Sequence, residues 1–248
     1  MGLCKLCGQE RKFVRSHIVP LAFHKHLQSD HDRPPVIIGN NLSAYPKRSP
    51  GGLYDEEMLC DDCEQRFGPW DTAGAEHLLQ RFESDKQPMT ASTGEVMAYQ
   101  MNAWDETSLR MFAISVLWRA AATTNYIFQR IKLGPHEQRV KQRVLEGDPG
   151  SPNDLSVVLC KWQANNPGLE LAQMSPYCNK IEGINVAKLF MGGFEVYVKV
   201  DQRPLPQPFP EIMLHPGRPV YAIGRPFESS KDWAAMRPGL DRYLATRR

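Results

Sequence analysis

Four cysteines have the spacing of a metal site. Cys4 and Cys7 enclose Lys-Leu, and Cys60 and Cys63 enclose Asp-Asp. Two residues between thiolates let both sulfur atoms reach one tetrahedral Zn²⁺ at about 2.3 Å. Gly8, after the first pair, can adopt the positive φ that the tight turn needs. We therefore predict a structural zinc site made by these four cysteines. The alternative is a set of four free or redox-active thiols.

The remaining composition is typical of a globular protein in a reducing compartment. Of the 248 residues 42% are hydrophobic and 23% charged, and the six cysteines are too few for a disulfide scaffold. Cys160 ends an apolar stretch and is predicted to be buried, while Cys178 lies in a predicted turn. No apolar run approaches the roughly 18 residues that cross a bilayer, and the N-terminus does not resemble a signal peptide. We expect a cytoplasmic protein without a membrane partner.

Charge is distributed unevenly along the chain. Residues 1–48 contain eight Lys or Arg and three carboxylates, whereas residues 55–64 contain six carboxylates and no Lys or Arg. A basic segment beside an acidic cluster suits a nucleic-acid-binding surface around a divalent metal. Two solvated faces of opposite sign would give the same pattern. The residues expected to contact phosphates on such a surface are Arg11, Lys12, Arg15, Lys47 and Arg48.

Short elements must position the two cysteine pairs. The first pair is expected in a turn on a hairpin, and the second opens a helix, whose N-terminus stabilises thiolate charge. One knuckle on a hairpin and one at a helix start is the arrangement of a treble clef. Residues 29–53 have the composition of a loop. Strands are predicted at 11–17 and 36–38, and helices at 20–28, 61–67 and 72–81.

The rest of the chain is predicted to be an α+β unit. The apolar residues of segment 106–133 occupy most of a helix circumference, which predicts a helix buried in a core. Gly147 is expected to end the next helix, and Gly192-Gly193 marks a hairpin. We predict helices at 106–133 and 135–146, a short helix or arm in the tail 231–248, and strands at 155–162, 185–191, 194–200 and 219–223.

The predicted fold class is α+β, with an N-terminal zinc-bound treble-clef module, a helical middle and a β-rich C-terminal region. We divide the chain into a zinc-binding module, residues 1–84, and an α+β domain, residues 85–248, with a long buried helix and C-terminal antiparallel strands. The aromatic residues of the helical middle are expected in the core rather than on a surface that stacks bases. These are Trp104, Phe112, Trp118 and Phe128.

The segment between the cysteine pairs carries a second motif. Ser16-His17-Ile18-Val19-Pro20 follows the first pair, and Tyr54-Asp55-Glu56-Glu57 precedes the second pair, which Glu64 follows. This pattern resembles that of the HNH endonucleases, the ββα-metal nucleases. Their first strand ends near a His that is often followed by Ile-x-Pro, an Asn precedes the second knuckle, and Cys-x-x-Cys-His opens the helix. The resemblance covers about residues 4–70.

The resemblance implies a role for three residues. His17 matches the general base, which takes a proton from the water that attacks a phosphodiester, while one divalent metal stabilises the scissile phosphate. Asp55 falls at or near the Asn that orients this His, and Glu64 matches the last metal-ligand His. A carboxylate is a suitable hard ligand for Mg²⁺ or Mn²⁺. Ser16 departs from the family, because an acidic or His metal ligand is frequent there. Neighbours would have to help hold the metal; the candidates are Asp61, Asp62 and His24.

The leading hypothesis is a metal-dependent nuclease of the HNH kind, acting on DNA or RNA with DNA favoured. A phage-defence or mobile-element setting is usual for that family. The alternative is a zinc-stabilised module that binds nucleic acid or protein without cleaving. A third possibility is a subunit of a larger complex, with a partner or a second copy bound through the C-terminal region. The sequence contains no Gly-x-Ser-x-Gly, phosphate-cradling glycine loop or dinucleotide fingerprint.

Overall fold

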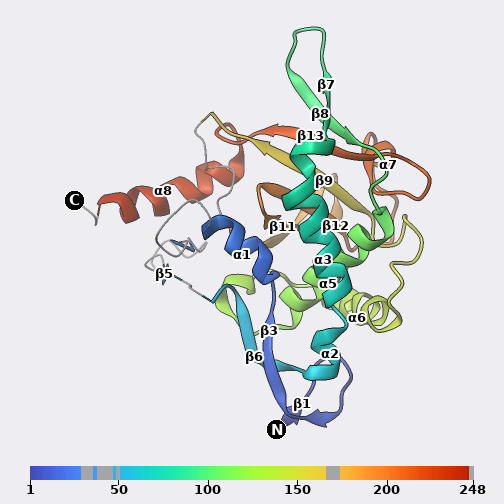
Figure 1. Ribbon diagram of the computed structural model, residues 1–248, viewed down its shortest axis with the longest axis vertical. Helices are drawn as coiled ribbons and strands as arrows, with labels where there is room; N and C mark the ends of the chain where they lie inside the picture. Colours follow the sequence, from blue (N-terminus) through green and yellow to red (C-terminus); the bar gives the residue numbers. More distant parts are fainter. Residues whose placement is uncertain (29–35, 38–46, 49–50, 166–173, 246–248) are drawn as a thin grey trace.

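The computed structural model describes residues 1–28, 36–37, 47–48, 51–165 and 174–245. Its main element is a seven-stranded sheet with helices packed against it, so the predicted mixed α+β class is confirmed (Figure 1). The chain begins at the end of the molecule that holds the cysteine pairs. The last helix, α8, lies beside the sheet and points away from it (Figure 1).

The sheet has the strand order β10-β11-β12-β9-β13-β8-β7. Adjacent strands are antiparallel except β9 and β13, which are parallel. The prediction of only antiparallel strands is therefore wrong for this pair. The glycine pair at 192–193 does form the predicted hairpin between β11 and β12. The bounds are β7 Gln87–Thr90, β8 Val96–Met101, β9 Val157–Gln163, β10 Tyr177–Ile181, β11 Ile184–Met191, β12 Phe194–Lys199 and β13 Val220–Pro226.

Three of these strands were not expected from the sequence. β7 and β8 form a hairpin that extends beyond the body of the molecule (Figure 1). β10 contains Cys178, so the predicted turn at that residue is wrong. β7 is exposed along its whole length and contains Pro88, which gives it little of the apolar alternation that marks a strand. Cys160 is buried on β9, as predicted.

The two faces of the sheet are covered differently. Alternate residues of a strand point to opposite faces. Ala187 and Val196 belong to the main core, which also contains the apolar residues of α5 (Glu106–Ala122). Val186 and Tyr197 belong to a smaller cluster on the other face. The sheet is buried on both sides, which is why its central strands read as nearly continuous apolar runs.

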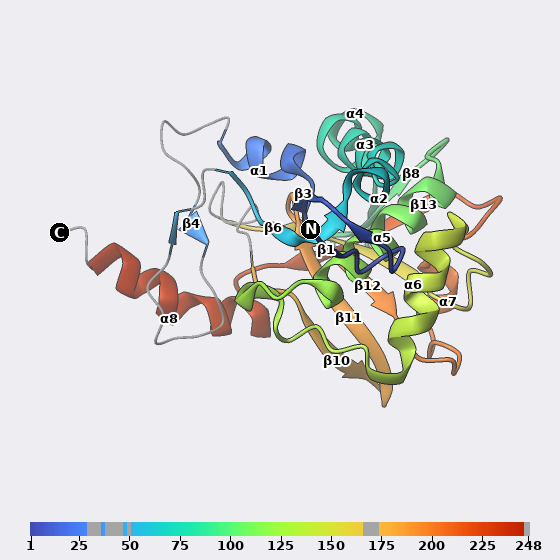
Figure 2. The same cartoon turned by 90° about the horizontal axis from the view of Figure 1, so that it is seen from below.

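The helix α5 is the centre of the core. The side chain of Asp105 caps it by accepting from the backbone N–H of Ser108 at 3.0 Å. The helix is buried from Leu109 to Ala120, as its apolar circumference predicted. It packs against β12 on one side and against α3 (Gly68–Ala75) and α6 (Glu137–Glu146) on others (Figure 2). The predicted core positions of Trp104, Phe112, Trp118 and Phe128 are confirmed.

The predicted length of this helix is wrong. It ends at Ala122 rather than at residue 133, and Thr123 has the extended ψ of 152°. The Asp55 carboxylate accepts from the Thr123 hydroxyl at 2.7 Å and from the Thr124 N–H at 3.3 Å. These bonds stabilise an extended backbone where a helix would otherwise continue. The apolar residues that follow are buried in a short 3₁₀ turn, Tyr126–Phe128, and the loop after it.

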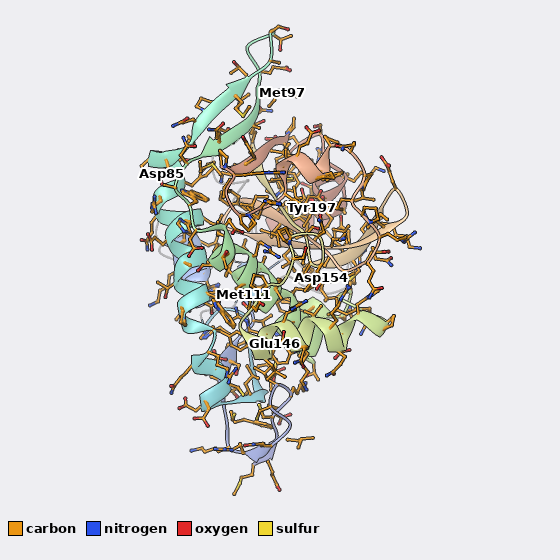
Figure 3. The ribbon with its side chains drawn as sticks, turned by 90° about the vertical axis from the view of Figure 1, so that its right-hand side faces the viewer. Asp85, Met97, Met111, Glu146, Asp154 and Tyr197 are labelled. Carbon is orange, nitrogen blue, oxygen red and sulfur yellow. The ribbon has the colours of Figure 1, made fainter. Side chains whose placement is uncertain are left out.

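A second long helical segment follows the cysteine pairs. It is continuous through α3, the π-helix η1 (Glu76–Arg81) and α4 (Phe82–Asp85). Figure 3 shows it along one edge of the molecule, with Asp85 at its end below the β7–β8 hairpin. The sequence predicted a helix over 72–81 but not its earlier start or its π-turn. Since both helix forms bury one apolar face, residue periodicity over six residues does not separate them.

The N-terminal elements surround the cysteines. β3 pairs with β6 in antiparallel register, with Ser16 opposite Asp55 and His17 opposite Tyr54. Strand β5, Lys47–Arg48, was not predicted, and most of the predicted 29–53 loop lies outside the described residues. The bounds are β1 Gly2–Leu3, β2 Glu10–Arg11, β3 Phe13–His17, α1 Leu21–Gln28, β4 Val36–Ile37, β6 Tyr54–Cys60 and α2 Asp61–Gln65.

Of the remaining helices, α6 and α8 match their predicted places, whereas α7 was not predicted. Helix α6 ends at Gly147, which has the positive φ of 69° expected at this position. The 3₁₀ turn η3, Gly134–His136, precedes it, and α7 (Phe209–Ile212) and α8 (Lys231–Ala245) follow the sheet strands. No helix in the described part of the chain is long and apolar enough to cross a membrane. One apolar core contains residues from both sides of position 84, where we divide the chain, and that division stays a prediction.

The close contact between α3 and α5 allows a prediction about stability. A Cβ atom on Gly74 of α3 would lie 2.5 Å from the Phe112 ring on α5, whereas a Cβ on Gly68 of the same helix would meet nothing within 4 Å. We expect Gly74→Ala to lower the free energy of unfolding by about 1–3 kcal/mol because the two helices must move apart. Urea unfolding measures this. Gly68→Ala is the control and should be neutral or raise stability by up to about 1 kcal/mol. Equal effects of the two would contradict this packing.

Candidate functional site

The four predicted cysteines lie together. Their sulfur atoms are all within 4.8 Å of one another, close enough to hold one metal ion. Cys4 and Cys7 lie in the turn between β1 and β2, and the N–H of Gly8, with φ +71°, donates to the Cys4 carbonyl at 2.8 Å. Cys60 ends β6 and Cys63 lies in α2. The two pairs therefore lie where the sequence predicted them, one in a turn between two strands and the other at the start of a helix.

Without a cation the thiols of this cluster differ in how readily they ionise. Burial raises the pKa of Cys4, but backbone N–H donors, including those of Cys60, Cys7 and Leu6, lower it to about 7. Burial and the neighbouring cysteines raise the pKa of Cys63. In the absence of a cation the cluster can therefore not carry four thiolates near neutral pH. A metal ion removes that restriction, because metal binding and thiol deprotonation are coupled.

Beside the cluster lies a pocket of about 670 Å³. It is bounded by α1 on one side and by α3 and η1 on the other. Two of the three residues predicted to be catalytic, His17 and Glu64, line this pocket, and Asp55 does not. The other lining residues are Pro20, Leu21, Ala22, Gly68, Asp71, Thr72, Ala75, Glu76, Gln80 and Arg81.

The ring of His17 is held by a backbone carbonyl. Its Nε2 lies 3.1 Å from the oxygen of Gly51. A carbonyl can only accept, so Nε2 carries the proton and Nδ1 is the basic nitrogen of the neutral ring. Burial lowers the pKa of His17, and the Arg15 and Arg119 charges act in the same direction, while the Gly51 carbonyl opposes them. The ring is therefore neutral at neutral pH and able to accept a proton.

Glu64 presents an unused carboxylate oxygen. Its Oε1 accepts from the backbone N–H of His17 at 3.3 Å. Its Oε2 is buried and has no hydrogen-bond partner among the described residues. Burial raises the pKa of Glu64, against the Arg119 charge and the bonds from Ser16 and His17. A buried carboxylate oxygen without a partner is costly, and a hard cation in the pocket would satisfy it.

Two further residues of this site were not identified from the sequence. Arg119 on α5 is fully buried; its Nη1 donates to the His17 carbonyl at 2.8 Å and to Asp71 Oδ2 at 2.9 Å. Its Nη2 donates to Asp71 Oδ1 at 2.5 Å and to the Ser115 hydroxyl at 3.2 Å. Asp71 lines the pocket and is 21% exposed. A signal was present, because a charged residue in a helix predicted to be buried on all sides must have a buried partner.

Asp55 does not orient His17, and that part of the prediction is wrong. One of its oxygens accepts from the N–H of Glu57 at 2.8 Å and the other accepts from Thr123 and Thr124. Its backbone is next to the site, since Ser16 is its register partner, but its carboxylate faces the end of α5. Asp55 therefore joins β6 to the helical core instead of contacting the histidine.

Arg11, Lys12 and Arg15, three of the basic residues expected to contact phosphates, do not line the pocket. Arg11 pairs with Asp62 at 3.4 Å. Arg15 pairs with Glu56 at 3.3 Å, and its guanidinium lies over the Tyr54 ring at 4.2 Å. Lys12 is exposed, while the side chains of Lys47 and Arg48 lie outside what the structure describes. The neighbours expected to help hold a metal, Asp61, Asp62 and His24, are not pocket residues either. Asp71 occupies that place.

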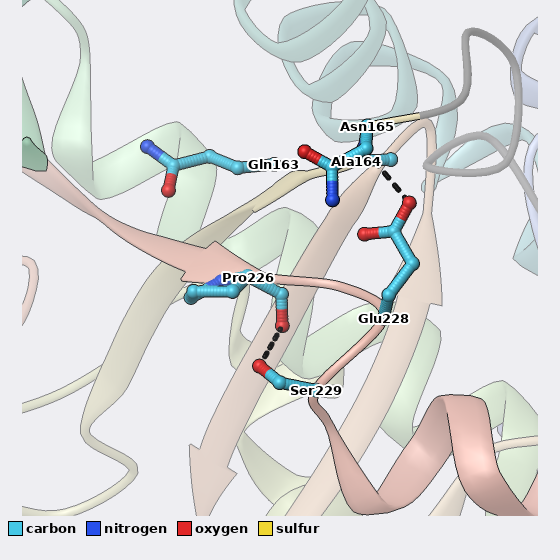
Figure 4. A pocket seen from close by; sticks show the side chains of 6 residues that line it. All are labelled: Gln163, Ala164, Asn165, Pro226, Glu228 and Ser229. Carbon is cyan, nitrogen blue, oxygen red and sulfur yellow. Dashed lines mark hydrogen bonds between the residues drawn. The ribbon is translucent and has the colours of Figure 1, made fainter.

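A second pocket lies at the ends of β9 and β13. Figure 4 shows it lined by Gln163, Asn165, Glu228 and other residues, with Glu228 accepting from the Asn165 N–H at 2.8 Å. Its volume is about 460 Å³. Among the described residues that line it there is neither a histidine nor a cysteine. The pocket that holds His17 is therefore the stronger candidate for chemistry.

Comparison of the chain with protein-family models, with curated proteins and with solved structures gives no match. The class of protein is therefore defined by fold and site alone. The chain is an α+β protein in which a four-cysteine cluster adjoins a pocket lined by a histidine and several carboxylates.

The contacts of Asp55 predict a structural role that a substitution can test. Asp55→Ala removes a buried acceptor from three donors, and we expect it to lower the free energy of unfolding by about 2–4 kcal/mol at neutral pH. Hydrogen bonds keep the pKa of Asp55 below its ordinary value, although burial opposes them. Its contribution is thus present above the ordinary pKa of about 4 and is lost as the pH falls through the lower folded value.

Urea unfolding of wild type and Asp55→Ala across pH 3–7 measures this contribution. The exposed neighbour Glu57, mutated to alanine, is the control and should change stability by less than about 0.5 kcal/mol. A stable Asp55→Ala variant that had lost only the function of the pocket would place Asp55 in the site after all.

Proposed function

We propose that this protein is a metal-dependent endonuclease of the HNH kind that hydrolyses phosphodiester bonds in DNA. The observation that carries the proposal is that His17 and Glu64 line one pocket and that Glu64 directly follows Cys63 of the cysteine cluster. The buried Oε2 of Glu64 has no hydrogen-bond partner among the residues that the structure describes. This hydrolysis needs a neutral histidine that accepts a proton and a carboxylate that can bind a cation. RNA is the second substrate class to test.

In this proposal the cysteine cluster is a structural zinc site in a treble clef. Four thiolates complete a tetrahedral Zn²⁺ and leave no position for water or substrate. The zinc therefore fixes β6 and α2 to the first knuckle. That arrangement supports the contact between Glu64, which follows Cys63, and the backbone of His17.

The pocket fits a hard divalent cation. Glu64 Oε2 and the carboxylate of Asp71 would hold Mg²⁺ or Mn²⁺. When bound, that ion would stabilise the charge of the scissile phosphate and of the leaving oxygen. The residues do the rest: Nδ1 of His17 accepts the proton of the attacking water, and Gly51 fixes the ring through Nε2. Arg119 holds the His17 backbone and Asp71 in one arrangement.

A zinc-stabilised binding module without cleavage is the second candidate. The observation that favours it is the Arg119–Asp71 ion pair, because both oxygens of Asp71 already accept from the guanidinium. In that case Asp71 would be a structural residue and Glu64 the one carboxylate ligand with a free oxygen. Such a protein would bind nucleic acid and leave it intact.

Cleavage separates the two candidates. Purified protein with Mg²⁺ or Mn²⁺ should nick supercoiled plasmid DNA, and His17→Ala should lower the rate by about 10²-fold or more, as loss of a general base does. The melting temperature of the variant should change little. His215→Ala, a histidine outside the pocket, is the matched control and should cleave as wild type. DNA binding without cleavage under any divalent metal would support the binding module.

The zinc proposal is tested separately by metal analysis. We expect one zinc per chain that resists mild chelation. Cys60→Ser should lose it and unfold the N-terminal part of the chain, because structural zinc supplies folding free energy. Cys160→Ser leaves the cluster intact and should retain its zinc. A Cys60→Ser protein that stays folded without metal would contradict the structural role.

A further inference from the structure

The π-helix η1 changes which side chain faces the pocket. Glu76 begins η1 and Arg81 ends it, and both line the pocket. On a regular α-helix, five residues at about 100° each would place Arg81 roughly 140° away from Glu76. In a π-helix the i→i+5 spacing brings these two residues into line. Accordingly, Arg81 Nη1 lies 3.5 Å from Glu76 Oε1.

Arg81 is also anchored from its other side. Its Nη2 lies 2.8 Å from Asp85 Oδ2, and the indole N–H of Trp104 donates to the same Asp85 oxygen at 2.8 Å. The Trp104 side chain is buried. Asp85 is thus fixed to the core and holds the guanidinium in place at the pocket wall. The arginine side chain is still 36% exposed, so it can accept a further anionic partner.

Arg81 is a basic residue in a pocket whose other charged groups include several carboxylates. The pocket lining includes the carboxylates Glu64, Asp71 and Glu76. Among its lining residues in the described part of the chain, Arg81 is the one lysine or arginine. A polyanion that enters this pocket therefore meets repulsion from the carboxylates and attraction from Arg81. Five guanidinium donors in a planar fork suit a phosphate.

The wall that carries Arg81 is long enough to follow a DNA strand. From Gly68 to Arg81 the residues that line the pocket recur at helical spacing along α3 and η1. Thirteen steps of at most about 1.5 Å give a length of up to roughly 20 Å. A duplex strand advances about 3.4 Å per nucleotide along its axis, so this length matches about six nucleotides. His17 and Glu64 line the same pocket as this wall.

We infer that the α3–η1 wall is a DNA-backbone-binding surface and that Arg81 contacts a phosphate next to the bond to be cut. The inference rests on the proposed function of the pocket. The π-turn then contributes to binding, since it rotates Arg81 from the far side of the helix to the side that faces the substrate. Glu76 is the intramolecular competitor that the phosphate displaces.

DNA binding tests this surface without cleavage. In a His17→Ala background with Mg²⁺, the Kd for a short fluorescein-labelled duplex is measured by anisotropy over a series of salt concentrations. We expect Arg81→Ala to raise the Kd about fivefold to tenfold and to reduce the slope of log K against log salt by about 1, as loss of one phosphate contact does. Glu76→Gln removes the competitor and should lower the Kd.

The matched control is Arg237→Ala, another exposed arginine with an acidic partner on a helix, outside the pocket. It should bind as the parent does. Arg81→Gln, which keeps the length of the side chain, should reproduce the loss if Arg81→Ala does not fold. Equal Kd values and salt slopes for the Arg81 and Arg237 variants would overturn the inference.

The outcomes also separate this inference from the proposed function. If the wild type cleaves in a His17-dependent way and the Arg81 variants bind normally, the nuclease proposal stands and the phosphate contact is wrong. If no cleavage occurs but binding depends on Arg81, the surface stands and the cleavage proposal is wrong.

Discussion

The arrangement of this site depends on one buried arginine. Arg119 has no solvent exposure, and removing its charge from water would be costly without compensation. The compensation is a two-pronged pair with Asp71, a bond to the His17 carbonyl and bonds to Ser115. These groups belong to α3, to β3 and to α5 itself, so a single side chain joins the elements near the cysteine cluster to the core beneath the sheet. The described lining of the His17 pocket thus comes from residues 17–81, and Arg119 from the second half of the chain holds two of its residues in place.

The cysteine cluster supports the same site from the N-terminal elements. It joins the first turn of the chain to the end of β6 and the start of α2, and α2 carries Glu64 next to Cys63. Glu64 in turn accepts from the His17 backbone. His17 is thus held through its N–H by the cluster side and through its carbonyl by Arg119. Neither contact restricts the ring, whose orientation comes from the Gly51 carbonyl.

A structural feature could be predicted from the sequence when the residues that determine it are close together in the chain. The cysteine pairs, the Gly192-Gly193 hairpin and the burial of α5 depend on spacing within a few residues, and the structure confirms them. The end of α5, by contrast, depends on Asp55, which is 68 residues away from Thr123. The π-turn at Glu76–Arg81 has no residue signature of its own. The charge of Arg119 in a helix predicted to be buried indicated a buried partner, but only the folded structure identifies Asp71 as that partner and brings both residues to His17.

The difference between local and long-range signals also explains why the pocket contains only part of the predicted site. His17 and Glu64 were predicted from a linear motif and do share a pocket, whereas Asp55 occupies its motif position with its side chain directed elsewhere. A motif position fixes the backbone, and the tertiary neighbours decide where the side chain points. We propose that a second, hard cation binds beside Glu64, separate from the zinc proposed at the cysteine cluster.

Anomalous diffraction from crystals grown with Mn²⁺ tests that claim most directly. At the zinc edge we expect one peak among the four cysteine sulfur atoms. At the manganese edge we expect a separate peak in the His17 pocket within coordination distance of the Glu64 carboxylate, at about 2.2 Å. Manganese bound only outside this pocket, in a protein that cleaves DNA, would show that no hard cation belongs beside Glu64.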